Sequence, residues 1–543
     1  MQSHRRRTAV RRAASVGLLA IALTIACSKQ GGPRSPSNVA VPALFAHIPA
    51  DTPYLMGALE PFPLEYYQHL QDATRPLTRG TFERHGGTMM TILRALEDEV
   101  AGNWTYEGFA KLGFADKPRF AVYGLGLLPV GRIEVGDEKV MVATISRLLA
   151  KVGWTTAPET RNGATLWRFE RGDSTVFVAV TNGQLVISYA PSAVASLTLG
   201  HVLGTDRPTN NLADGAALKQ VMTKHGFGPS FLAYADARLL IAKVAELMPS
   251  TTPPSCQAEL RTLAERVPRF AMGYTELTRH RASFGTVFEL APDLLADLKA
   301  LKAPAPGLDV VLSGDPIFGF GGAANETAAR ALVSRFGTVL VGIGRACNTQ
   351  ELGDVGEQVK RAAATPLPVP VSGVAMALHA LSKQPGEAMP DRIEAIGLAT
   401  GTSGKQILDS AMRLVPMGSS LGIVADGKLN QLKPMMPIPF DVYAGVSERS
   451  VVIAVGDRDR ALAEKAMAAK DTSPVPLLTM TYDYQKFVEL QRMFDDDDDD
   501  DDDGDKTAER EASIEMMKHF GRADLTVDVS TYGVGFWMSL EMK

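Results

Sequence analysis

Two stretches of this 543-residue chain repeat one order of apolar strands and helical patterns, on either side of a break at residues 301–307. The segment Ala-Asp-Thr-Pro-Tyr-Leu-Met-Gly at 50–57 is echoed by Ser-Gly-Asp-Pro-Ile-Phe-Gly at 313–319. Likewise, Arg-Ile-Glu-Val at 132–135 is echoed by Arg-Ile-Glu-Ala at 392–395, and apolar residues at helical spacing follow each copy. A chain of this length is too long for one hydrophobic core, so the repeated order predicts two tandem, duplicated domains.

A β-hairpin is predicted at the same point of each stretch. In the first, strands at 176–180 and 185–188 flank Asn182-Gly183, which is the favoured two-residue hairpin turn. In the second, strands at 441–445 and 451–454 flank a turn near residues 447–448. Each stretch then continues with a single strand and a closing strand pair, at 230–234, 269–275 and 283–290 in the first and at 478–482, 525–529 and 533–540 in the second. Strands joined by short turns pair antiparallel, so the sequence predicts an α+β fold in which each domain is an antiparallel sheet with helices packed on one face.

Composition shifts along the chain set the expected boundaries. A polar segment rich in Gly, Pro and Ser precedes the first domain, and Lys-Ala-Pro-Ala-Pro-Gly ends the break between the two domains. The expected parts are a signal peptide at 1–26, a tether at 27–41, a first domain at 42–300, a linker at 301–307, and a second domain at 308–543 that contains an acidic loop at 495–505.

The amino terminus shows the pattern of an export signal. Five arginines precede an apolar stretch at 13–26 that is too short to span a bilayer comfortably. The stretch ends in Leu-Thr-Ile-Ala before Cys27, and this ending resembles the lipobox of bacterial lipoproteins. In that family the Cys sulfur carries a diacylglycerol and the chain is cut just before it, although Thr24 stands where Leu is usual. The alternative is an ordinary cleavable signal with an unmodified Cys.

The lipobox resemblance implies that Cys27 anchors the protein to a membrane of the cell envelope. Ser28 follows the Cys, and in well-studied lipoproteins a residue other than Asp at that position favours the outer membrane. We therefore expect an outer-membrane location facing the periplasm or the cell surface. In such an oxidising compartment the remaining pair, Cys256 and Cys347, forms either a disulfide between the two halves of the chain or two buried thiols.

A run of aspartates at 495–503, with Asp505, concentrates ten acidic residues in one place. Apart from this run and the arginines of the signal, positive and negative residues balance, which argues against a nucleic-acid partner. With Gly504 at the sharp turn of a calcium loop, the oxygen ligands would come from Asp499, Asp501 and Asp503, with Asp505 beside them, but Arg510 stands where the closing carboxylate is needed. Adjacent like charges repel, so a solvated loop is expected, with a weak calcium site as the alternative.

Two motifs nearly match catalytic or nucleotide-binding patterns. Residues 399–406 resemble a phosphate-binding loop, but Gln406 occupies the position of the hydroxyl that holds Mg²⁺. Ser420 lies in a Gly-x-Ser-x-Gly pattern, but a helix precedes it where a nucleophile elbow needs a strand. No two histidines have metal-ligand spacing. The sequence therefore predicts no cofactor, no nucleotide partner and no catalytic residue.

A second resemblance covers roughly residues 42–543. The Pro-Ala-Asp-Thr-Pro opening at 49–53, the strand Pro-Arg-Phe-Ala-Val at 118–122 and the duplicated plan resemble a family of exported bacterial proteins and lipoproteins grouped as a domain of unknown function. This resemblance implies an envelope location and the architecture, and it implies no chemistry.

These observations favour a lipid-anchored envelope protein that is not an enzyme and has a binding or scaffolding role, with an envelope protein or a lipid as partner. The second hypothesis is a carrier or receptor for an apolar ligand such as a lipid, for which the many Met and Phe residues would form a pliable lining. A third is an enzyme whose site is assembled from distant residues. A continuous apolar cavity that opens to the surface would favour the carrier.

Overall fold

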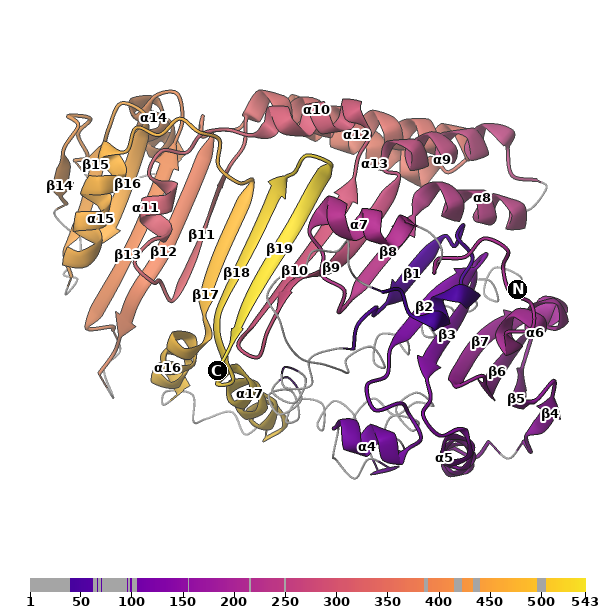
Figure 1. The fold of residues 1–543 in the computed structure, drawn as a ribbon. Helices are drawn as coiled ribbons and strands as arrows, with labels where there is room; N and C mark the ends of the chain where they lie inside the picture. The colour runs from indigo at the N-terminus through magenta and orange to yellow at the C-terminus, as the bar shows by residue number, and fades with distance from the viewer. Residues whose placement is uncertain are drawn as a thin grey trace. The chain divides into compact units, whose positions relative to one another are not determined.

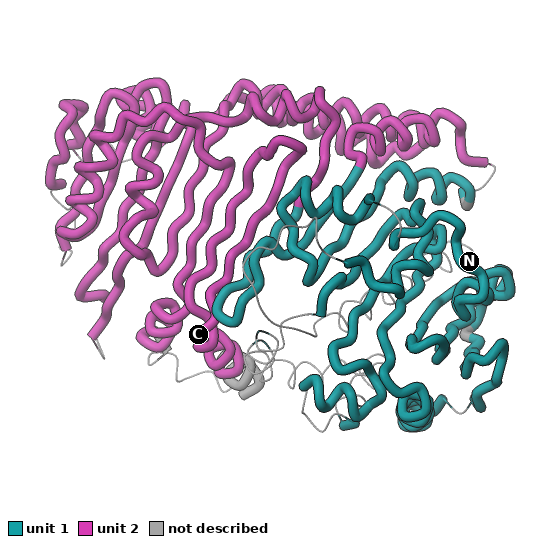
Figure 2. Tube along the Cα trace, in the orientation of Figure 1, with its two compact units in different colours: residues 1–248, 269–286 teal, residues 249–268, 287–543 magenta. Residues whose placement is uncertain are grey.

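The structure is a computed structural model in which the chain forms two compact units (Figure 2). The first unit comprises residues 1–248 and 269–286, and the second comprises residues 249–268 and 287–543. The structure describes residues 40–61, 105–154, 156–213, 216–248, 251–384, 389–414, 422–432, 440–495 and 504–543, together with Tyr66, Leu70, Ala95, Asp98 and Glu99.

The first unit alternates short helices with antiparallel strands (Figure 1). Its elements are η2 (Ala43–His47), β1 (Tyr54–Gly57), α4 (Tyr106–Lys111), β2 (Phe120–Leu125), β3 (Leu128–Glu134), α5 (Glu138–Lys151), β4 (Glu159–Arg161), β5 (Ala164–Arg171), β6 (Ser174–Thr181), β7 (Gln184–Pro191), η3 (Ser192–Val194), α6 (Ala195–Leu203), α7 (Ala217–His225), β8 (Leu232–Asp236), α8 (Ala237–Leu247) and β9 (Arg269–Leu277). The strand β10 (Arg281–Glu289) begins in this unit and ends in the second.

The second unit contains the longest helices of the described chain. Its elements are α9 (Pro254–Arg266), α10 (Pro292–Leu301), α11 (Leu308–Leu312), β11 (Phe318–Ala323), α12 (Glu326–Ala346), α13 (Gln350–Ala364), β12 (Gly373–Ser382), β13 (Arg392–Thr400), α14 (Gly404–Leu414), β14 (Leu429–Gln431), β15 (Val442–Val446), β16 (Ser450–Val455), α15 (Asp457–Ala468), β17 (Leu478–Asp483), α16 (Tyr484–Asp495), α17 (Gly504–Met517), β18 (Phe520–Val529) and β19 (Gly533–Met542).

Local sequence explains several of these elements. The β6–β7 hairpin turns at Asn182 and Gly183, which have positive φ angles of 51° and 68°, as the Asn-Gly turn requires. The helix α5 begins where the Asp137 side chain accepts hydrogen bonds from the backbone N–H groups of Lys139 and Val140. Both predicted hairpins, β6–β7 and β15–β16, are confirmed. The prediction of mixed helices and antiparallel sheet is confirmed as well.

Six consecutive strands of each unit pair in the same order, β7–β3–β2–β1–β8–β9 in the first and β16–β13–β12–β11–β17–β18 in the second. In the first unit the order is β5–β6–β7–β3–β2–β1–β8–β9, with β4 added beside β5. In the second it is β14–β15–β16–β13–β12–β11–β17–β18–β19. Every one of these pairs is antiparallel.

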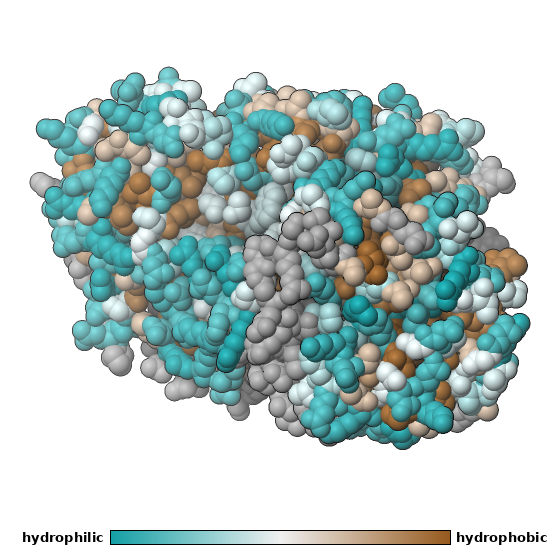
Figure 3. Space-filling model, in the orientation of Figure 1, coloured by the Kyte–Doolittle hydropathy of each residue, from teal (hydrophilic) through white to brown (hydrophobic). Residues whose placement is uncertain are grey.

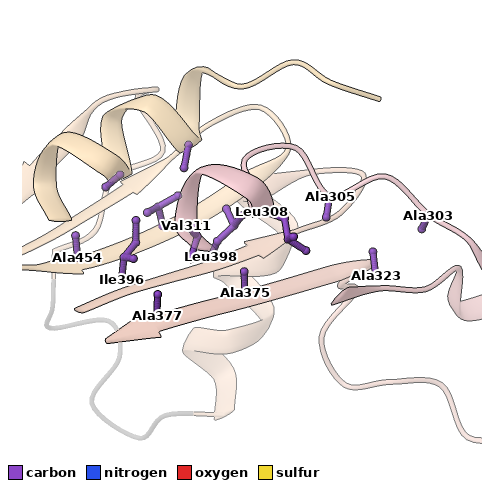
Figure 4. Packing of buried hydrophobic residues seen from close by; sticks show 13 residues of the cluster. Ala303, Ala305, Leu308, Val311, Ala323, Ala375, Ala377, Ile396, Leu398 and Ala454 are labelled. Carbon is purple, nitrogen blue, oxygen red and sulfur yellow. The ribbon is translucent and has the colours of Figure 1, made fainter. Parts of the chain in front are cut away.

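One face of the second unit's sheet is covered by α11 and α15, which are drawn in front of the strands in Figure 1. Leu308 and Val311 of α11 point toward Ile396 and Leu398 of β13 (Figure 4). The strands and α15 contribute alanines around them, which allow the helices to approach the sheet closely: Ala375, Ala377, Ala454, Ala463 and Ala466. In the same orientation, Figure 3 shows hydrophilic residues around smaller hydrophobic patches on this side of the unit.

The structure places residues 301–307 inside the second unit, where the sequence suggested a linker between domains. Ala303 and Ala305 are buried in its core, and Pro304 forms a β-bridge with Pro474. Small apolar residues that alternate with prolines suit a flexible connection. Here, however, two of these residues help to fill the core of the second unit. The signal at 1–26, residues 27–39 of the tether and residues 496–503 of the acidic loop lie outside the described residues.

Candidate functional site

The face of the second unit's sheet opposite α11 and α15, which we call the open face, carries three adjacent rows of side chains across seven strands. Side chains at directly paired positions of antiparallel strands lie on the same face, so the register defines each row. The central row contains Ile453, Gly397, Met376, Phe320, Met480, Leu525 and Met538. One flanking row contains Val455, Ala395, Leu378, Phe318, Tyr482, Ala523 and Leu540. The other contains Val451, Ala399, Val374 and Gly322 on four strands and Leu478, Val527 and Phe536 on the remaining three.

No charged side chain interrupts these three rows, and all of their residues keep some solvent exposure. Val374 is 44% exposed, Met376 45% and Ile453 46%, and at the far edge Met538 is 47% exposed. The alternate residues of β12 lie on the other face of the sheet, where Ala375 and Ala377 are buried under α11 and α15. The open face is therefore an apolar surface that remains accessible to solvent.

A pocket of about 510 Å³ lies at the edge of the open face, where β11, β12 and β17 meet α12 and the end of α13. Its volume falls within the usual range of small-molecule sites. Its floor includes Phe320, Gly322, Val374 and Leu478, which also belong to the open face. Its wall comes from one side of α12, with Ala329 and Val333, and from the segment after α13, with Leu367 and Val371.

The two charged side chains at this pocket, Arg330 and Glu326, are already bound within the protein. The Arg330 guanidinium donates hydrogen bonds of 2.8 Å to the carbonyl oxygens of both Ala363 and Ala364, which lack partners in their own helix because they end α13. The Glu326 carboxylate accepts a 3.1 Å hydrogen bond from the backbone N–H of Leu367. The pocket therefore offers an apolar interior with satisfied charges at its margin.

Tyr482 is the only residue of these three rows with a polar side-chain group. Its ring lies 6.4 Å from Phe318 and 4.9 Å from Phe487, measured between ring centroids. Burial raises the pKa of the Tyr482 phenol above its ordinary value. The phenol is therefore neutral across the physiological pH range, and the open face carries no charge.

A buried pair, His379 and Asp459, is the most notable polar arrangement elsewhere in the second unit. Nδ1 of His379 lies 2.7 Å from Oδ1 of Asp459, and both side chains are fully buried. Nε2 of His379 lies 2.9 Å from the carbonyl oxygen of Ser313, which can only accept, so Nε2 must donate. Because the side chains are enclosed, this pair joins β12 to α15 and offers no surface to a substrate.

The structure joins Cys256 to Cys347 in a disulfide. Both residues belong to the second unit: Cys256 lies on α9, and Cys347 follows the last residue of α12. The bond therefore lies within one unit, where the sequence suggested a link between two halves of the chain.

The remaining candidates from the sequence give no site. Cys27, Asp499, Asp501, Asp503 and Ser420 lie outside the described residues, and Asp505 is placed in the first turn of α17 without a described side chain. In the segment that resembles a phosphate-binding loop, Lys405 forms an ion pair with Asp409 on α14. Within the described part of the chain, no cluster of three or more His, Cys, Asp or Glu could hold a metal ion.

The helices α12 and α13, which contribute to the pocket wall, were not predicted from the sequence. A signal for α12 was present in Ala329, Val333 and Phe336, which recur at helical spacing as an apolar stripe. Among the residues that the structure describes, no helix combines the length and the apolar character needed to cross a bilayer. Comparisons with protein families, with curated proteins and with solved structures found no match.

Proposed function

We propose that this protein is a lipid-anchored binding protein of the bacterial cell envelope that has no catalytic role and holds an apolar ligand, such as a lipid, on the open face of its second unit. The observation that carries the proposal is the open face itself, with three uncharged rows that continue into a pocket. Contiguous exposed apolar surface of this kind marks interaction sites in soluble proteins.

The exposed side chains supply the free energy for binding. Full burial of a Val, Ile, Met or Phe side chain is worth about 1.5–3 kcal/mol. Val374, Met376 and Ile453 are each still nearly half exposed, so an occupant gains roughly 1 kcal/mol at each of them. Seven strands spaced about 4.8 Å apart make each row roughly 29 Å long. This is longer than one acyl chain, which spans about half of the ~30 Å hydrocarbon core of a bilayer, so a row can hold an extended chain.

The chemistry of the open face favours a ligand with few polar groups. Specific protein–protein interfaces contain about one hydrogen bond per 100–200 Å², and their rims are polar. In the three rows of the open face, the strand ladders use the backbone groups, and the side chains offer no hydrogen-bonding group apart from Tyr482. Methionines at three positions of the central row (Met376, Met480 and Met538) add flexible side chains that adapt to hydrocarbon.

The two units have arisen, in this proposal, by tandem duplication. Supporting this, the pairing order β7–β3–β2–β1–β8–β9 of the first unit has the same connections as β16–β13–β12–β11–β17–β18 of the second. A glycine lies at the equivalent central position in both, Gly131 between Val122 and Ile187 and Gly397 between Met376 and Ile453.

The test uses two methionines of similar exposure in the second unit. Met376 on the open face is 45% exposed, and Met389, outside the strands, is 49% exposed. We expect Met376→Glu to weaken binding of a fluorescent fatty acid at least tenfold, because a carboxylate would be desolvated under the ligand. Met389→Glu should bind as the unsubstituted protein does.

Equal binding by both variants would remove the open face as the site. Organic extraction of the protein purified from its native membrane, followed by mass spectrometry, gives an independent readout. We expect a co-purifying lipid that is depleted in Met376→Glu and retained in Met389→Glu, whereas a co-purifying protein in place of lipid would contradict the proposal.

A further inference from the structure

We infer that the pocket receives the methyl end of a long acyl chain while the remainder of that chain lies on the open face, so that the lipid binds tail first. This inference rests on the proposed function, and it adds the class of ligand and its orientation.

The pocket and the open face are continuous. Four residues of the open face form the floor of the pocket, and Phe320 and Val374 belong to adjacent rows of that face. A ligand that enters the pocket therefore emerges onto the rows, with no polar barrier between the two. A compact apolar ligand would fill the pocket alone, whereas a long, thin chain buries surface in both places.

The orientation follows from the charges at the pocket margin. The Arg330 guanidinium already donates hydrogen bonds to the carbonyl oxygens of Ala363 and Ala364. The Glu326 carboxylate already accepts one from the backbone N–H of Leu367. A carboxylate or phosphate headgroup placed in the pocket would lose its water and lie close to the Glu326 carboxylate, which repels it. Arg330 already pairs with Glu326 at 3.9 Å and donates to two carbonyl oxygens, so it compensates poorly for that loss. The methyl end of an acyl chain has no such requirement.

The α12 wall gives the means of testing this arrangement. Ala329 lines the pocket, and its small side chain leaves room for the ligand. Ala331 is on the same helix but is exposed and does not line the pocket. Val333 also lines the pocket and is 41% exposed, so shortening it should enlarge the space with little effect on folding.

The experiment measures the affinity of the delipidated full chain for a series of saturated fatty acids from octanoic to stearic acid, by displacement of a fluorescent fatty acid. Each methylene that enters the pocket should tighten binding about fourfold, and each later methylene, which lies on the half-exposed open face, should tighten it less. The endpoint of the steep rise is therefore the chain length that fills the pocket. This endpoint should come at a shorter chain in Ala329→Phe and at a longer chain in Val333→Ala. Ala331→Phe should match the unsubstituted protein.

Three results would overturn the inference. An affinity that does not depend on chain length would remove the acyl chain as the occupant, and unshifted endpoints in both pocket variants would remove the pocket as its terminus. In each of these cases fatty acids still bind and the open face remains the proposed site. If the unsubstituted chain binds no fatty acid in the series, the proposed function fails as well.

Discussion

His379 shows how the sheet sets the position of a single side chain. The register of β12 against β13 shifts between Leu378 and Ala380, so His379 is the extra residue of a bulge. Its ring lies under α15, on the same face as Ala375 and Ala377, where Asp459 lies in the first helical turn. The positive end of the helix dipole favours a carboxylate at that point.

Removing one partner of this pair should be far more damaging than removing both. We expect His379→Leu to lower the free energy of unfolding by about 3–5 kcal/mol, because it leaves a buried carboxylate without a partner. The double variant His379→Leu with Asp459→Leu should recover most of that loss. Urea denaturation followed by circular dichroism measures the free energy of unfolding of both variants. Equal losses in the single and double variants would show that the two side chains are not energetically coupled.

Sequence alone could predict some contacts between individual residues and not others. The pairing of Cys256 with Cys347 was one of two outcomes left by a count of cysteines in a chain that the sequence predicts to be exported. The contact between His379 and Asp459 had no such indication, because it joins distant residues through a bulge that depends on tertiary packing.

At the scale of elements, the hairpins were predictable and the α12–α13 pair was not. Asn182-Gly183 determines its turn locally, whereas α12 contains Gly337 and Gly344, which disfavour a helix by about 1 kcal/mol each. The structure shows the reason for these glycines. A Cβ on Gly337 would lie 2.7 Å from the carbonyl oxygen of Gly356, and one on Gly344 would lie 2.5 Å from the backbone nitrogen of Gly353. The glycines allow α12 and α13 to pack closely, which is a tertiary benefit that a local pattern cannot reveal.

The disulfide between α9 and α12 should stabilise the second unit. The bond closes a loop between residues that are 91 positions apart in the sequence, which restricts the unfolded chain. Reduction should lower the free energy of unfolding by about 2–4 kcal/mol. Urea denaturation with and without reductant measures this, and the double variant Cys256→Ala with Cys347→Ala serves as the control that should not respond to reductant. If reductant lowered the free energy of unfolding of both proteins by a similar amount, the loss would not come from the bond between Cys256 and Cys347.

For the whole molecule, the combination of helices with antiparallel sheet could be predicted, whereas the face left open could not. The strand β12 reads Gly-Val-Ala-Met-Ala-Leu from residue 373, so both of its faces are apolar and the sequence is typical of a fully buried strand. Only the packing of α11 and α15 on Ala375 and Ala377 shows that Val374 and Met376 are the exposed pair.

The membrane anchor is the prediction that belongs to the whole chain. If Cys27 carries the lipid, Cys27→Ala should move the protein from the membrane fraction to the soluble or unprocessed fraction, while Cys256→Ala should remain in the membrane fraction. Fractionation followed by mass spectrometry of the amino-terminal peptide measures both. An unmodified Cys27 on a membrane-associated protein would show that something other than a lipid on this Cys holds it there.

The division of the chain between the two units has a consequence for biosynthesis. Residues 249–268 belong to the second unit although the first unit resumes at 269, so a growing chain cannot finish its first folded body before residue 286 has emerged. During synthesis the thiol of Cys256 emerges well ahead of its partner Cys347, which follows 91 positions later. If the protein is exported as proposed, an oxidase acting in that interval could join Cys256 to another protein, so correct oxidation depends on how quickly the rest of the second unit follows.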